Sequence, residues 1–138
     1  HMHLTLLLST DYVHSGLHYI HFPAKYGFFC VLQSRMHTHL TIHYHDEQQP
    51  LPGVEFKLYR IADTSDFAEF TLTDEFDDYP ITVTDHDVSS WNELAFTLKS
   101  YIAADQPQPV DNGVTDENGV VSFPNTVERL RPGLYLVS

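Results

Sequence analysis

Four histidines have the residue type and spacing that come closest to a metal site. His37, His39, His43 and His45 occupy odd-numbered positions of one short segment, between less polar neighbours. Alternate residues of a β-strand share a face, so these imidazoles would project from the same side. Imidazole is the commonest protein ligand for zinc and copper. No cysteine or carboxylate accompanies them at a fixed ligand spacing. The polar face of a half-buried strand explains the pattern more simply, and we expect no metal and no other cofactor.

Three polar clusters could take part in acid–base chemistry or bind a cation. They are Asp85-His86-Asp87, Asp111-Asn112 and Asp116-Glu117-Asn118-Gly119. Consecutive strand residues point to opposite faces, so the first cluster would not converge on one substrate. The other two resemble fragments of calcium loops, but they lack the alternating ligands and the closing bidentate Glu. A polar loop and turns therefore explain all three clusters better.

Motifs for nucleophilic or phosphate chemistry do not occur in the sequence. There is no Gly-x-Ser-x-Gly turn, and no Gly-rich phosphate loop. The single cysteine, Cys30, cannot form an intrachain disulfide, and we interpret it as a small apolar residue rather than a reactive thiol. We therefore expect no catalytic residue and no enzymatic activity.

The charge balance excludes two classes of partner. The 138 residues include 19 acidic and seven basic ones, for a net charge of −12. Nucleic acid and anionic lipid both require a basic surface, so neither is an expected partner. The early apolar run from Leu6 to Leu8 is far shorter than the roughly 20 residues of a membrane-spanning helix, so we expect no membrane insertion. No basic region precedes that run, and no signal peptide is recognised. The length suits one domain.

Residues 1–36 differ from the rest of the chain. They contain one acidic residue, Asp11, and five of the ten histidines, without a sustained apolar period. We expect an arm that is poorly ordered or adds one extra strand. From residue 37 strict alternation begins, and it predicts a strand with Leu40, Ile42 and Tyr44 toward the core.

Further strands follow the same period of two. After Gly53 we expect Val54, Phe56 and Leu58 to face inward, with Glu55 and Lys57 facing out. Asp74 to Asp78 is an acidic break. Other pairs and triplets at strand spacing are Phe70 and Leu72, then Tyr79, Ile81 and Val83.

One helix is predicted, at about residues 90–103. Ser90 with Glu93 three residues later matches a capping box. An apolar stripe at helical spacing predicts a face that packs on the sheets. The stripe consists of Trp91, Leu94, Ala95, Leu98, Tyr101 and Ile102.

The last quarter of the chain carries two turn signals. Asn118-Gly119 is typical of a tight hairpin turn, and Val121 and Phe123 would share one face of the strand after it. Pro132-Gly133 makes a second break before a strand that ends at Val137. A sequence that stops within a strand suggests a fragment or a missing further strand.

These turns and strands are also where a family resemblance lies. Thr115-Asp116-x-Asn118-Gly119-x-x-x-Phe123, followed by Leu130-x-Pro132-Gly133-x-Tyr135-x-Val137, resembles the C-terminal half of a Cna B-type (SpaA-like) domain. The resemblance covers about residues 39–138. It implies that residues 37–138 form a prealbumin-like (Ig-like) β-sandwich of about seven strands, with the helix on a crossover between strands. A truncation of the sandwich at its C-terminus is one expectation from this resemblance.

The function that the resemblance implies is structural. Such domains belong to pilins and surface adhesins of Gram-positive bacteria, where they serve as stalks or spacers. The implied location is the cell wall or cell surface, outside the cell. The implied partners are neighbouring domains or pilin subunits and a host ligand or glycan. No sortase motif of the Leu-Pro-x-Thr-Gly type occurs.

Many members of the family form an isopeptide bond between a first-strand Lys and a later Asn, and this chain departs from that pattern. The matching first-strand position is Tyr44. Lys57 should face outward, Lys99 lies on the helix, and Lys25 lies outside the resemblance. We therefore expect no isopeptide bond, with the Tyr44 ring filling the core position instead.

Two functions of other classes remain open. One is a glycan-binding or accessory module of an extracellular enzyme, in which exposed rings such as Trp91 or Tyr79 touch a sugar. The other is a metal-binding module built on the histidine face.

Overall fold

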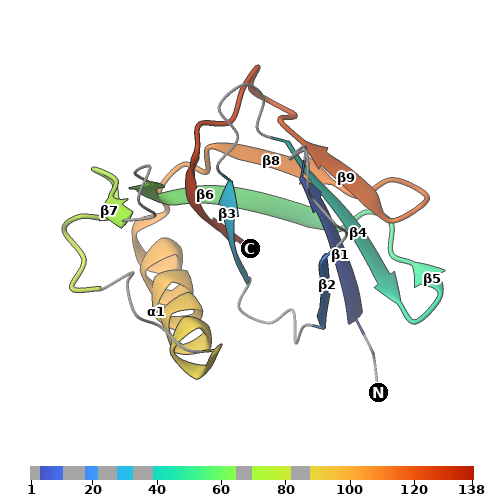
Figure 1. Cartoon of the computed structure of the whole chain (residues 1–138), viewed down its shortest axis with the longest axis horizontal. Helices are drawn as coiled ribbons and strands as arrows, with labels where there is room; N and C mark the ends of the chain where they lie inside the picture. Colours follow the sequence, from blue (N-terminus) through green and yellow to red (C-terminus); the bar gives the residue numbers. More distant parts are fainter. Residues whose placement is uncertain (1–3, 11–17, 22–27, 33–38, 65–69, 82–87) are drawn as a thin grey trace.

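The protein folds into two antiparallel sheets and a helix. The computed structural model describes residues 4–10, 18–21, 28–32, 39–64, 70–81 and 88–138 (Figure 1). Within these residues each sheet has five strands, and α1 (Val88–Asp105) is the helix. The expected mainly-β class with one helix is confirmed.

The first sheet is organised around β4. Its strands run in the order β2-β1-β4, and β5 and β9 both pair with the other side of β4. The alternation of β4 has the predicted effect, because Leu40 and Ile42 are fully buried and Tyr44 is 7% exposed. The strands are β1 (Leu4–Thr10), β2 (His18–His21), β4 (Leu40–Asp46), β5 (Gln49–Pro50) and β9 (Val120–Phe123).

The second sheet is organised around β6 and β10. Its order is β3-β10-β6, and β7 and β8 both pair with the other side of β6. Phe56 and Leu58 of β6 are buried, whereas Glu55 and Lys57 are exposed, as alternation predicts. The strands are β3 (Phe28–Leu32), β6 (Glu55–Thr64), β7 (Phe70–Leu72), β8 (Asp111–Val114) and β10 (Gly133–Val137).

Two apolar cores result, one on each face of the second sheet. Between the sheets, Tyr135 and Val137 of β10 pack with residues of β4, β6 and β9. On the opposite face, Leu134 and Leu136 pack with the helix. β10 is therefore apolar at every position because both of its faces are covered. The expected strand at Leu134–Val137 is present, and it lies between β3 and β6 rather than at a sheet edge.

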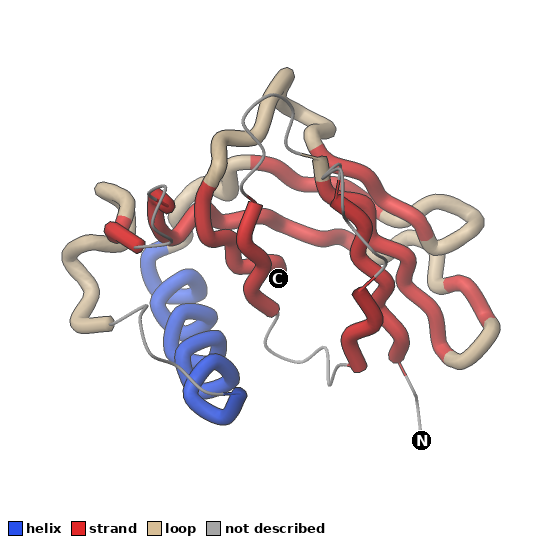
Figure 2. Tube along the Cα trace, in the orientation of Figure 1, coloured by secondary structure: helices blue, strands red, loops and turns tan. Residues whose placement is uncertain are grey.

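The helix forms the third layer of the molecule. Leu94, Ala95 and Leu98 are buried against the second sheet, together with Tyr59 and Ile61 of β6. Figure 2 shows the helix on one side of the strands, away from the first sheet. The apolar stripe is thus confirmed at Leu94, Ala95, Leu98 and Ile102, and the side chain of Trp91 lies outside the described ones. The predicted capping box is wrong. The helix begins at Val88, so Ser90 is its third residue and is not positioned to cap it.

The N-terminal segment contributes three strands. We expected a poorly ordered arm or one extra strand, but β1 and β2 lie in the first sheet and β3 in the second. β1 pairs with β4 along seven residues, from Leu4 opposite Asp46 to Thr10 opposite Leu40. The short apolar runs of this segment are long enough to pair with neighbouring strands, although no period is sustained between them.

The Asn118-Gly119 turn joins the two sheets. Gly119 has the expected positive φ, 73°, and its N–H donates to the Asp116 carbonyl. However, the strands on either side do not form a hairpin, because β8 pairs with β6 and β9 pairs with β4. Thr115 holds the end of β8 against Val54, and the Tyr44 N–H donates to the Gly119 carbonyl. Because β8 is bonded to β6 and β9 is bonded to β4, the two strands lie in different sheets.

The segment after β7 is a turn rather than a strand. Tyr79 and Ile81, predicted to lie in a strand, follow a series of turns and bends, and Val83 lies outside the described residues. Within the acidic break, Phe76 is fully buried and packs under the helix. The acidic residues around it are exposed, so the break is anchored by one aromatic ring.

Candidate functional site

One hollow in the described surface lies where β6 meets the turn before β10. The register of β6 on β10 shifts between Leu134 and Tyr135, which places Arg60 opposite Tyr135 and Ala62 opposite Leu134. This bulge makes Ile61 the extra residue, and it leaves Arg60 on the same face as the inter-sheet core. Arg60 therefore emerges at the end of that core.

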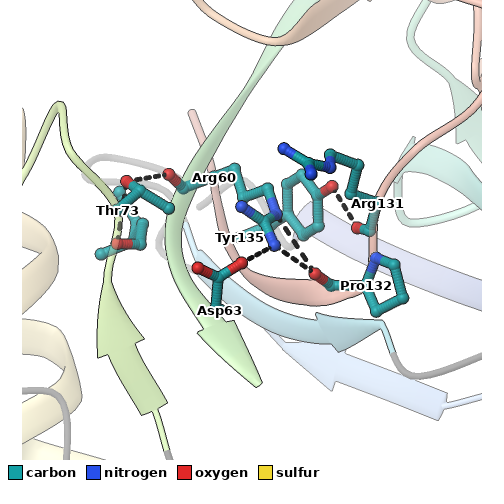
Figure 3. Close-up of polar contacts among 7 residues, drawn as sticks. Arg60, Asp63, Thr73, Arg131, Pro132 and Tyr135 are labelled. Carbon is teal, nitrogen blue, oxygen red and sulfur yellow. Dashed lines mark hydrogen bonds and ion pairs between the residues drawn. The ribbon is translucent and has the colours of Figure 1, made fainter. Parts of the chain in front are cut away.

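Arg60 is held in one orientation by three polar contacts (Figure 3). Its Nε and Nη2 atoms donate to the Pro132 carbonyl at 3.1 and 2.8 Å. Nη2 also donates to the Asp63 carboxylate, which neutralises the guanidinium. The Arg60 carbonyl in turn accepts a 2.9 Å hydrogen bond from the Thr73 hydroxyl. These contacts fasten the turn before β10 and the end of β7 to β6.

The hollow beside Arg60 has a volume of about 320 Å³ and a lining of mixed charge. Two arginines, three carboxylates, a threonine and two apolar side chains surround it. They are Arg60, Asp63, Leu72, Thr73, Asp74, Glu75, Val110 and Arg131. The one hydroxyl of this set, that of Thr73, donates to a backbone carbonyl, and no imidazole or thiol stands beside it. The lining suits polar contact with another molecule better than nucleophilic catalysis.

The sequence does not reveal this hollow. Arg60 and Arg131 are separated by 71 residues, and the pairing of β6 with β10 brings both of them to the lining of this hollow. The alternation of β6 was the available signal, since Arg60 continues the inward series of Phe56 and Leu58.

The histidine face lies on the first sheet. His39 is exposed, and His43 and His45 are half-buried on the side of β4 opposite its core residues. His37 lies outside the described residues. Among the described side chains no group of three histidines, cysteines or carboxylates is placed to hold a metal ion. The described side chains thus add no second group of ligands to the histidine face, and the absence of a metal stays a prediction.

Asp111 and Asp116 both serve the backbone. The carboxylate of Asp111 is 1% exposed and accepts from the N–H groups of Asn112, Asn125 and Thr126 and from the Thr126 hydroxyl, at 2.7 to 2.8 Å. Donors occupy both of its oxygens, so it is unsuited to bind calcium. Asp116 accepts from the N–H groups of Asn118 and Val120 in the turn.

Tyr44 occupies the core as expected. Its ring meets that of Phe56 edge-on, with centroids 5.2 Å apart, and burial raises the pKa of its hydroxyl. Lys57 and Lys99 are exposed, and Lys57 lies 3.9 Å from Glu55. Lys25 lies outside the described residues. Neither lysine that the structure describes is in the core, and the absence of an isopeptide bond stays a prediction.

Tyr79 is partly covered by the helix. Its ring stacks on that of Tyr101 at 4.3 Å with an interplanar angle of 3°, and its hydroxyl donates to Asp105 at 2.5 Å. That hydrogen bond to a carboxylate raises the pKa of Tyr79 to about 12. One face of the ring is therefore not available to a sugar. The side chain of Trp91, the other candidate ring, is outside the described set.

Two remaining candidates have little structural description. Asp85-His86-Asp87 lies outside the described residues. Cys30 is the central residue of β3, opposite Tyr135 in the ladder.

Comparisons with protein-family models, curated proteins and solved structures found no match for this chain. The resemblance to Cna B-type domains therefore rests on the two motifs alone. Within the described residues, no helix has the length and apolar character needed to cross a membrane.

Proposed function

We propose that this chain is a structural module of a cell-surface pilin or adhesin, with a stiff spacer role between neighbouring domains or subunits. The proposal includes an extracellular location, in the cell wall or at the cell surface, and no enzymatic activity. The family motifs carry the biological assignment. The support from the fold concerns mechanics, and it comes from β10.

The placement of β10 suits a load-bearing element. β10 has a strand neighbour on each side and an apolar layer on each face, and all five of its residues are buried. The ladder continues to the last residue, where Ser138 and Lys57 exchange two backbone hydrogen bonds of 2.9 Å. A force applied through Ser138 would load these hydrogen bonds along the strand, so that many must break together.

The hydrogen bonding of the buried polar side chains also suits a passive spacer. None of the described buried side-chain polar atoms lacks a hydrogen-bond partner. Buried polar groups left without partners are typical of sites that await a ligand or store strain. The described core has no such group. The charged residues that line the hollow lie at the surface, at the end of the inter-sheet core.

Force spectroscopy on single molecules tests the proposal. The protein is linked in tandem with a helical-bundle reference domain and pulled through its termini. We expect it to unfold at clearly higher force than the reference, because shearing a central strand is harder than separating helices. Leu136→Ala, which removes a fully buried side chain of β10, should lower the unfolding force.

Val114→Ala is the matched control, because Val114 of β8 is 55% exposed and its truncation should leave the force unchanged. A wild-type protein that unfolds no later than the helical reference would contradict the spacer role.

The two alternatives have less support. The half-buried, stacked ring of Tyr79 counts against a sugar platform at that residue. The histidine face lacks a further ligand element among the described residues.

A further inference from the structure

Asparagine followed by glycine occurs twice in the chain, at two places with different surroundings. Asn112-Gly113 lies within β8, and Asn118-Gly119 lies in the turn before β9. An asparagine before glycine is chemically labile, because the glycine nitrogen can attack the side-chain amide of the asparagine. Glycine has no Cβ atom that would hinder this attack. The two pairs therefore share one reactivity, and their local structure decides whether the reaction takes place.

The reaction at Asn118 needs no partner other than water. The Gly119 nitrogen bonds to Asn118 Cγ, the bond from Cγ to Nδ2 breaks, and the proton of the Gly119 N–H leaves with the amide nitrogen as ammonia. The product is a five-membered succinimide ring. Water then adds to either ring carbonyl and opens the ring, which leaves aspartate or isoaspartate. Because the attack is intramolecular, its rate depends on how easily the nitrogen and Cγ reach each other.

The turn leaves the Asn118 side chain free to move. Asp116, Glu117 and Asn118 are exposed, and the Asn118 side-chain amide has no hydrogen bond within the described structure. Gly119 itself is buried against the Tyr44 carbonyl, but its N–H points into the turn and donates to the Asp116 carbonyl at 2.9 Å. This hydrogen bond must open before the nitrogen can attack, and exposed turns open locally at lower free energy than paired strands.

Asn112, by contrast, is fastened on both sides. Its N–H donates to the Asp111 carboxylate at 2.8 Å, and its carbonyl accepts from Asn125 Nδ2 at 2.7 Å. Gly113, which follows it, is buried in β8 opposite Phe56 of β6. Both residues of this pair therefore belong to the strand ladder, and their backbone cannot rearrange unless β8 separates from β6.

The space around Gly113 is also closed. A Cβ atom there would lie 2.6 Å from Val121 Cγ2 and 3.3 Å from the Phe123 ring. A succinimide needs room beside the glycine for the atoms of the new ring, and side chains of β9 already fill that side. Ring closure at Asn112 would therefore require β8 to leave both β6 and β9.

We propose that Asn118 is a site of spontaneous deamidation in the folded protein, and that β8 protects Asn112 from the same reaction. Each event adds one negative charge to a chain that already carries −12. Isoaspartate also inserts a methylene group into the backbone next to Gly119, whose carbonyl accepts the Tyr44 N–H at 2.8 Å. The isoaspartate product therefore disturbs the contact between the turn and β4.

Peptide mapping of the wild-type protein tests the proposal. The folded protein is incubated in mildly alkaline buffer, and samples taken over time are digested with trypsin. Both asparagines lie in the tryptic peptide 100–129, so fragment ions in mass spectrometry measure both conversions in one spectrum. We expect Asn118 to convert roughly tenfold faster than Asn112 or more, because the turn opens at lower free energy than the paired strand. Equal conversion of the two asparagines in the folded protein would overturn the proposal.

Incubation of the same protein in urea provides the unfolded reference. Both asparagines precede a glycine, so we expect them to convert at similar rates once the strand and the turn have unfolded. The time that Asn118 needs in urea also sets the time scale of the folded experiment. An Asn118 that stays intact in the folded protein over many such periods would show that the turn protects it, contrary to the proposal.

Two glutamine variants identify the site independently. Glutamine would have to close a six-membered ring, which forms much more slowly, so Asn118→Gln should abolish the early mass increase of the intact folded protein. Asn112→Gln is the matched control and should leave that increase unchanged. Circular dichroism verifies that each variant is folded, and the wild-type peptide map decides if one is not. An early increase that persists in Asn118→Gln would refute the assignment to Asn118.

Discussion

At the scale of single residues, glycine makes the connection between the sheets possible. Gly119 has a positive φ, and a Cβ atom there would lie 2.4 Å from the Tyr44 carbonyl oxygen and 3.1 Å from the Leu51 nitrogen. Gly53 has an almost identical φ, 74°, but its Cβ atom would meet nothing within 4 Å. Comparing substitutions at Gly119 and Gly53 therefore distinguishes the cost of a steric clash from the cost of a strained backbone.

We predict that Gly119→Ala destabilises the protein by about 3 kcal/mol and Gly53→Ala by about 1 kcal/mol. Both substitutions incur the cost of a positive φ, whereas only the first also forces a backbone carbonyl to move. Urea denaturation monitored by tyrosine and tryptophan fluorescence measures both values. An equal decrease in the free energy of unfolding of the two variants would show that the Tyr44 carbonyl does not lie close to Gly119.

The hydrogen bond of the Tyr79 hydroxyl makes a contribution to stability that is lost at high pH. Its folded pKa, about 12, lies above the ordinary tyrosine value of 10, and the hydrogen bond to Asp105 is the largest cause. Because the folded state holds the proton more tightly, this contribution is complete below pH 10 and is lost as the pH rises through 12. Burial raises the pKa values of Tyr44 and Tyr59 as well, and repulsion from Glu55 adds to the shift at Tyr59.

Asp105→Asn tests this assignment. The variant removes the carboxylate charge but keeps an acceptor, so we expect Tyr79 to ionise nearer to the ordinary value. Ultraviolet absorbance of tyrosinate against pH, recorded on the native protein, measures the change. A late-ionising fraction of tyrosine remains in the variant from Tyr44 and Tyr59. Superimposable wild-type and variant curves would show that Asp105 does not hold Tyr79.

At the scale of elements, Asp111 links the two sheets where β8 begins and β9 ends. It begins β8 of the second sheet, and its carboxylate accepts from Asn125 and Thr126, which follow β9 of the first sheet. The side chain is buried, so its loss leaves backbone N–H groups without partners and out of reach of water.

We predict a loss of about 3 kcal/mol for Asp111→Ala, because several charge-assisted hydrogen bonds disappear from a buried position. Asp116→Ala is the control. It removes two similar hydrogen bonds from an exposed turn, where water replaces them, and should cost about 1 kcal/mol. Equal losses of stability, in the same urea experiment, would argue that Asp111 is a surface residue in solution.

At the scale of the whole molecule, the covalent state of the folded protein is the informative property. A Lys–Asn isopeptide bond releases one ammonia. The structure places Tyr44 in the core, and the two lysines that it describes are exposed. We predict that the intact folded protein has the mass of its sequence, measured by electrospray mass spectrometry. A mass lower by one ammonia would contradict this prediction, and peptide mapping around Lys25, Lys57 and Lys99 would locate the bond.

Much of the strand pattern could be predicted because it depends on local periodicity. Leu40, Ile42 and Tyr44, and later Phe56 and Leu58, face the core as alternation requires. The helix was also predictable from its apolar stripe. Its start was not, because Ser90 fits a cap in sequence while the helical backbone already begins at Val88.

The candidate site was largely beyond prediction. Arg60 and Arg131 line the same hollow because β6 pairs with β10, and no local pattern in the sequence specifies which strands pair. Phe76 is a related case, since four acidic neighbours conceal a ring that is fully buried.

The sequence alone determined the mainly-β class, the inward residues of β4 and β6, and the turn at Asn118-Gly119. These features arise from side-chain period and backbone freedom within a few residues. Only the tertiary structure decided that β8 and β9 belong to different sheets, that β10 is covered on both faces, and that residues 4–32 supply three strands. Those outcomes depend on which strands compete for each edge and which apolar faces must be covered, and that competition involves the whole chain at once.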